Sequence, residues 1–149
     1  MPIVGFQFDK VSAEKKSKVK SKLEVKNSIN IKGIEFESVA LTRSKDSLLR
    51  FNFSFHTEFS QGLGDVVLEG HLLYYDEEKK LKDLKRSWDN KEAMDPKLMA
   101  RILNHILIRC NIKTLVLCEE VNLPPHLQIP TISPTKQNIS KTAVHDYIG

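Results

Sequence analysis

Apolar and polar residues alternate along much of the first half of the chain, which is the period of half-buried β-strands. The alternation runs over residues 4–9 and, most clearly, over residues 49–56, where three phenylalanines share one face. Turn-forming residues follow at 61–65, and an apolar segment returns over residues 66–75. The last two strands therefore form a predicted β-hairpin. Because the returning strand is apolar on both sides, we expect helices on one side and room for another chain on the other.

Two further strand-like segments lie before the hairpin. Over residues 18–25, lysines alternate with aliphatic residues, which predicts a strand with one basic face. The β-like pattern continues over residues 29–36, where Gly33 predicts a bulge or bend. The first half of the chain is thus predicted to form a sheet.

The period changes to that of a helix after residue 75. Over residues 76–90, Leu81, Leu84 and Trp88 recur at helical spacing among charged residues. Asp95 and Pro96 are a typical helix start, and a broad apolar face extends from there to Cys110. Asn111 either ends or kinks this helix, and residues 115–118 fit both a continued helix and a short strand.

The C-terminal part alternates prolines with aliphatic residues. Proline excludes both helix interior and central strand, so residues 122–132 are predicted to form an extended, polyproline-like arm. Two structural roles remain open for this arm, which either lines a groove or seals the protein's own core. We divide the chain into a domain over residues 1–132 and a polar tail over residues 133–149.

Composition and charge restrict the function classes further. The 149 residues suit one globular domain, with 40% apolar and 28% charged residues and a net charge of +4. The chain has neither an apolar run long enough to cross a membrane nor the pattern of a signal peptide, so we expect it in the cytoplasm, with no membrane insertion. Cys110 and Cys118 form no metal-binding or disulfide pattern and are expected in the core.

Catalytic and metal-binding motifs are weak in this sequence. His56 and His71 would face each other if the hairpin turned near Leu63 and Gly64, with Glu69 as a third ligand. A polar sheet face with two histidines explains the same residues without a metal. No nucleophile has an evident base and orienting partner. We therefore predict no enzymatic activity, no cofactor and no metal.

Nucleic-acid binding is the alternative function. Seven lysines against two glutamates lie between Lys10 and Lys26, and a basic strand from Lys15 to Lys26 would present Lys18, Lys20 and Lys22 to phosphates. No aromatic residue interrupts this stretch to stack on bases. Lysines also protect edge strands from aggregation, which is the competing explanation.

The order of elements resembles the SecB fold of export chaperones and, more closely, archaeal proteins described as SecB-like. The resemblance rests on four segments, which are Val67–Tyr75, Leu84–Trp88, Ile106–Asn111 and Val121–Pro125 with Ile129-Pro130 beyond it. It implies an α+β fold with a four-stranded antiparallel sheet, helices packed after the hairpin and an extended proline-rich C-terminal arm. It covers residues 2–132.

The same resemblance implies a function. SecB-like chaperones hold unfolded or extended polypeptides in apolar grooves and assemble as homo-oligomers, so we expect a dimer or tetramer here. The helix from Pro96 to Cys110 would then mediate subunit contacts. The residues expected to bind polypeptide are those of the arm, namely Leu123, Pro124, Pro125, Leu127, Ile129 and Ile132. The tail lacks the acidic character of the bacterial chaperone, so the resemblance does not extend to docking on an export motor.

Overall fold

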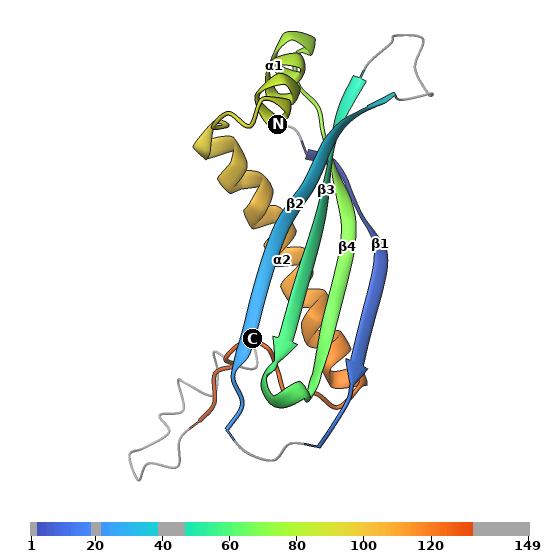
Figure 1. Ribbon diagram of the computed structural model, residues 1–149, viewed down its shortest axis with the longest axis vertical. Coiled ribbons are helices and arrows are strands. Elements are labelled where there is room, and N and C mark those ends of the chain that lie inside the picture. Colours follow the sequence, from blue (N-terminus) through green and yellow to red (C-terminus); the bar gives the residue numbers. More distant parts are fainter. Residues whose placement is uncertain (1–2, 19–21, 39–46, 133–149) are drawn as a thin grey trace, which may run out of the picture.

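The computed structural model describes residues 3–18, 22–38 and 47–132, which form one antiparallel sheet with helices on one face (Figure 1). This arrangement confirms the predicted α+β class and the four-stranded antiparallel sheet followed by helices. In chain order the elements are β1 (Ile3–Lys15), β2 (Val25–Ser38), β3 (Ser47–Phe59), a short 3-10 turn (Ser60–Gly62), β4 (Gly64–Tyr74), α1 (Glu78–Asp89) and α2 (Pro96–Glu120).

The strands lie in the order β1-β4-β3-β2, and each neighbouring pair is antiparallel. The predicted hairpin is β3 and β4, with Gln61 and Gly62 at positive φ in the turn. In β2 the register shifts between Ile31 and Gly33, which confirms the bulge predicted at this glycine. The two central strands, β3 and β4, are therefore the ones that the sequence pattern predicts most clearly.

The protein's core lies between the inner face of the sheet and α2. Phe51, Phe53 and Phe55 of β3 are fully buried, as the alternating pattern predicts. From the helix side, Ile102 and Ile106 are fully buried in the same cluster. The predicted apolar sheet face and the predicted apolar helix face are thus the two halves of one core.

Helix α2 begins as predicted and extends further than Cys110. The Asp95 side chain accepts a hydrogen bond from the Lys97 backbone N–H, and Pro96 occupies the first helical position. The helix continues through Asn111 to Glu120 and crosses the sheet diagonally (Figure 1). Burial of Thr114 and Cys118 on the core side explains this continuation, because tertiary packing stabilises helix beyond a residue of low propensity.

The predicted basic strand is wrong. The chain leaves β1 after Lys15 and enters β2 at Val25, and these strands are the opposite edges of the sheet. Residues 16–18 and 22–24 of the connection are not in a strand, and Val19, Lys20 and Ser21 lie outside the described residues. The backbone of the connection bonds instead to the hairpin turn, where Lys16 N–H donates to Leu63 O and Ser60 N–H donates to Glu24 O.

No helix in the described ranges is both long enough and apolar enough to span a membrane.

Candidate polypeptide-binding surfaces

Two buried residues anchor the C-terminal arm to the domain. At Asn122 the backbone turns through positive φ and ends α2. Leu123 then enters the core with 5% of its surface exposed, and its backbone N–H donates to Cys118 O at 2.8 Å. Three residues later His126 is also buried, so the first part of the arm closes the lower end of the core (Figure 1).

The imidazole of His126 holds the arm against both layers of the domain. Its Nε2 lies 3.0 Å from Asn111 Oδ1 on α2, and its ring meets the Phe55 ring edge-to-face at 6.4 Å. Burial lowers the pKa of His126, so the ring is neutral and donates from Nε2 to the amide oxygen. Its Nδ1 is buried and has no hydrogen-bond partner within the described part of the chain.

Beyond His126 the apolar side chains of the arm point outward. Leu127, Ile129 and Ile132 are 40%, 53% and 71% exposed, and a hollow of about 500 Å³ is lined by Gln128, Ile129, Pro130 and Thr131. The six residues predicted to bind polypeptide thus divide into two groups. Leu123 is buried and Pro124 half-buried, whereas Pro125 and the three aliphatic residues are accessible.

A second apolar surface lies on the outward face of α2. Ile108 and Ile112 are each 60% exposed, and Val116 continues the same stripe at the i+4 spacing. The predicted apolar face of this helix does not include these three residues. The sequence feature that could have revealed the stripe is the apolar character of α2 around most of its circumference. This property is typical of a helix that is buried on all sides.

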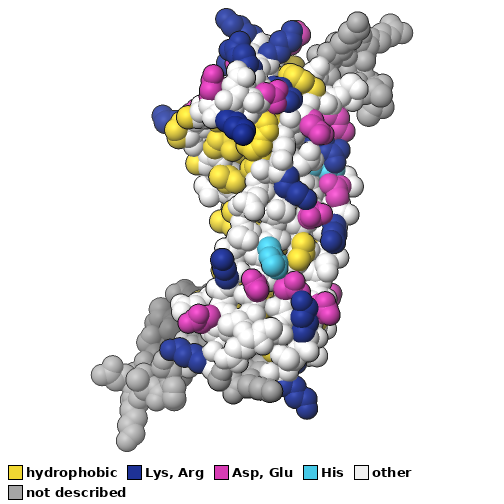
Figure 2. Space-filling model, in the orientation of Figure 1, with side chains coloured by type: hydrophobic (Ala, Val, Ile, Leu, Met, Phe, Trp, Pro, Cys, Tyr) yellow, Lys and Arg dark blue, Asp and Glu magenta, His cyan; other side chains and the backbone are white. Residues whose placement is uncertain are grey.

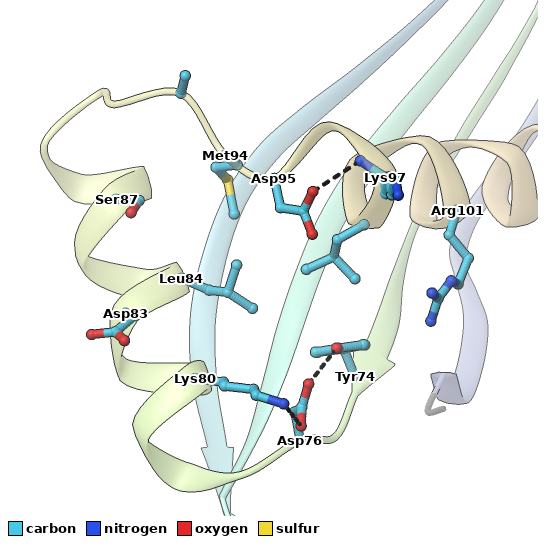
Figure 3. A pocket seen from close by; sticks show the side chains of 12 residues that line it. Tyr74, Asp76, Lys80, Asp83, Leu84, Ser87, Met94, Asp95, Lys97 and Arg101 are labelled. Carbon is cyan, nitrogen blue, oxygen red and sulfur yellow. Dashed lines mark hydrogen bonds and ion pairs between the residues drawn. The ribbon is translucent and has the colours of Figure 1, made fainter.

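Two cavities lie where α1 packs near the start of α2. The first, of about 640 Å³, lies between Tyr74 at the end of β4 and both helices (Figure 3). The second, of about 690 Å³, is lined mainly by Trp88, Met94 and Met99. Figure 2 shows apolar side chains gathered over this end of the molecule. Sequence reasoning missed both cavities because they exist only once α1 and α2 are placed side by side.

The outer face of the sheet is polar and bears ion pairs (Figure 2). His71 Nδ1 lies 2.7 Å from Asp9 Oδ2, and the Arg50 guanidinium lies 3.6 Å from the same carboxylate. On β2, the Lys32 ammonium bonds to Glu69 at 3.0 Å and lowers the pKa of that carboxyl. On β4 the outward side is mixed, since Val67 and Leu73 lie there as expected together with Glu69 and His71.

The predicted pairing of His56 and His71 is also wrong. The register places His56 opposite Val67 and His71 opposite Asn52, because the turn centres on Gln61 and Gly62 and not on Leu63 and Gly64. His56 instead lies 3.4 Å from Asp65. Among the described residues, no three histidine, cysteine or acidic side chains are grouped as metal ligands.

The lysines proposed for nucleic acid lie on the connection between β1 and β2. Lys18 and Lys22 are exposed there, and Lys20 lies outside the described residues. Since no strand aligns them, the structure does not place these charges on one regular face.

The two cysteines are buried as expected, and burial raises the pKa of the Cys110 thiol to about 12.

Comparison with known proteins gives one structural likeness. No family model matches the chain, and no curated protein matches its sequence. Among solved structures, the chain is similar to a SecB-like chaperone of Mycobacterium tuberculosis, solved in complex with a ChAD peptide from an antitoxin. The two chains are 14% identical with a TM-score of 0.42, over 89% of this chain and 91% of the other. At these values the likeness assigns no activity to this chain.

Proposed function

We propose that the protein is a non-enzymatic, SecB-like chaperone of the cytoplasm that holds unfolded or extended polypeptides without a cofactor. The observation that carries the proposal is the arm, an extended segment anchored in the core at Leu123 and His126 with three apolar side chains directed outward. A client would lay its own apolar side chains against Leu127, Ile129 and Ile132. The driving force is the removal of apolar surface from water, which requires no particular client sequence.

The construction of the arm suits weak, general binding. Pro124, Pro125 and Pro130 fix φ, so the arm loses little conformational freedom when a client docks. Burying roughly 200 Å² of apolar surface on the arm gives about 5 kcal/mol before the losses of association are subtracted. One arm would therefore hold a client weakly, and a stable complex needs several arms.

We further propose that several arms are brought together by homo-oligomerisation through α2. The stripe of Ile108, Ile112 and Val116 matches itself when two copies of the helix cross antiparallel about Ile112. An apolar stripe that matches itself thus favours a second copy of this chain as the partner.

The proposal is tested by suppression of aggregation of a reduced, unfolding model client. We expect the wild type to suppress aggregation at near-stoichiometric ratio, and the double variant Leu127→Ser with Ile129→Ser to lose most of this activity while unfolding at the same temperature. Val11→Ser on β1 is the matched control, since it removes an exposed aliphatic side chain far from the arm in sequence. No suppression by the wild type, or equal suppression by the double variant, would contradict the role of the arm.

Nucleic-acid binding remains an untested prediction. No observation favours it over polypeptide holding, because Lys18 and Lys22 lie on an irregular connection.

A further inference from the structure

The cavity between α1 and α2 combines an apolar wall with charged side chains of both signs. Its apolar residues are Leu84 from α1, Leu98 from α2 and Met94 from the connection between the helices. Its charged residues are three acids and three bases, namely Asp76, Asp83, Asp95, Lys80, Lys97 and Arg101. Figure 3 shows Asp76, Lys80, Leu84, Met94, Asp95 and Arg101 around a common space, whereas Asp83 projects from the outer side of α1.

Each of the three acids already has a partner. Asp76 accepts the Tyr74 hydroxyl at 2.7 Å and the Glu77 backbone N–H at 2.8 Å, and it pairs with Lys80. The carboxylate of Asp83 accepts from Arg86 at 2.9 Å. Asp95 caps α2 through the Lys97 backbone N–H at 3.1 Å. Each of these acids is therefore already engaged with a donor on its own or a neighbouring element.

The bases from α2 are different. The ammonium of Lys97 and the guanidinium of Arg101 pair with no carboxylate in the part of the chain that the structure describes. Arg101 extends from α2 toward the side of the cavity closed by Tyr74 (Figure 3). The Tyr74 hydroxyl on this side of the cavity donates to Asp76 at 2.7 Å. Unused donors beside an apolar wall suit a ligand with an anionic head and an apolar body.

We propose that this cavity binds the carboxyl end of a polypeptide whose last residues are apolar. Arg101, supported by Lys97, would hold the terminal carboxylate, since a guanidinium binds a carboxylate through two parallel hydrogen bonds. The last side chain would contact Leu84 and Leu98. The neighbouring cavity shares Met94 and adds Trp88 and Met99, so it would take an apolar residue further up the peptide.

This inference rests on the proposed polypeptide-binding function, but it concerns a different surface. The arm would hold internal segments of any apolar character, whereas the cavity would select chain ends. The two surfaces lie at opposite ends of the molecule in Figure 1, so each is testable without the other.

The test is a binding titration with one peptide in two forms. An N-acetylated hexapeptide, Ser-Gly-Ala-Leu-Ala-Leu, is used as the free acid and as the C-terminal amide. Trp88 is the single tryptophan of the chain and lines the neighbouring cavity, so its fluorescence reports occupancy. We expect the acid to bind about tenfold more tightly than the amide, the scale of one charge-assisted pair.

The variant Arg101→Gln should weaken binding of the acid about tenfold and leave binding of the amide unchanged. Lys79→Gln is the matched control, because it removes the same charge from an exposed position on α1 outside the cavity, and it should leave both affinities unchanged. Decanoate, titrated separately, distinguishes a fatty acid from a chain end and should bind more weakly than the peptide acid.

Equal affinities for acid and amide would overturn the carboxylate site, as would tighter binding of decanoate than of the peptide acid. Aggregation suppression, measured on the same preparations, separates the two proposals. Suppression by a wild type that does not distinguish acid from amide overturns the cavity inference alone, whereas selective peptide binding without suppression overturns the chaperone proposal alone.

Discussion

Gly70 is the residue at which the sheet tolerates a side chain least. It lies opposite Phe8 and Phe53 on the two neighbouring strands. An added Cβ would lie 2.8 Å from Phe53 Cζ and 3.1 Å from the Phe8 Cα, and it would collide with the Gln7 carbonyl oxygen. The β1 contacts are backbone atoms of Gln7 and Phe8, which cannot move aside as the end of a flexible side chain can. A glycine is therefore required here by close approach of the neighbouring strand.

Gly70→Ala should accordingly lower the free energy of unfolding by about 1–3 kcal/mol, the range for overpacking in a core. Gly33→Ala provides the control, since nothing lies within 4 Å of the Cβ position there. We expect that variant to be neutral or stabilised by up to about 1 kcal/mol. Urea denaturation of both proteins checks the pair, and equal effects would show that strand packing at Gly70 is looser than described.

His126 makes stability depend on pH. Burial lowers its pKa in the folded state below the ordinary 6.5, so the unfolded chain takes up a proton more readily. Stability is therefore full above about pH 6.5 and falls as the pH drops below it. His105, whose pKa is lowered by burial and by Arg109, acts in the same direction.

The variant His126→Gln should reduce this pH dependence by at most about 1.4 kcal/mol per pH unit, because glutamine keeps a neutral donor for Asn111 and cannot be protonated. The measurement is the free energy of unfolding at about pH 7.5 and at about pH 5.5 in wild type and variant. An unchanged difference between the two pH values would mean that His126 is protonated in the folded protein.

At the scale of elements, the arm is divided into a sealing part and an exposed part. Leu123→Ala should lower the free energy of unfolding by about 2–5 kcal/mol, because it opens a cavity beside Gly64 and the core. Leu127→Ala, at an exposed position, should change it by no more than about 0.5 kcal/mol. Thermal unfolding of the two variants tests the division, and similar losses would show that the whole arm is structural.

The elements that the sequence predicts correctly are those whose pattern is set by one dominant face. The phenylalanines of β3 alternate without interruption, and Asp95 with Pro96 marks the start of α2 by local chemistry alone. Such patterns depend only on a residue and its near neighbours in the sequence, so they can be interpreted without knowledge of the fold. The hairpin, the bulge at Gly33 and the helix start were all accessible in this way.

The elements that sequence reasoning missed depend on partners distant along the chain. The lysine stretch alternates like a strand, but β1 and β2 are opposite edges and the connection must cross the sheet. A shift of the turn by two residues changes every cross-strand neighbour, which is why His56 does not face His71. The cavities between α1 and α2 require a helix packing that no local pattern specifies.

At the scale of the whole molecule, the domain has two layers, the sheet and the helices. Each layer packs one face against the other and leaves its second face uncovered. The open face of the sheet carries Arg50, Asp9 and other charged side chains and needs no further cover. The uncovered face of α2 carries the exposed apolar residues Ile108, Ile112 and Val116, whereas the uncovered face of the sheet is charged. Polar and apolar faces on opposite sides of a thin domain favour assembly through the helix side, with the sheet facing water.

If the chain assembles through α2 as proposed, Ile112→Glu should convert the oligomer to smaller species, because two glutamates would meet where the helices cross. The substituted side chain is exposed in the single chain, so the fold should be retained, with a change in unfolding free energy of about 0.5 kcal/mol or less. Val4→Glu on β1 makes the same chemical change at a similarly exposed residue and should leave the mass unchanged. Light scattering coupled to size exclusion measures both masses. A monomeric wild type would contradict assembly, whereas a mass lost only in Val4→Glu would move the subunit interface to the edge of the sheet.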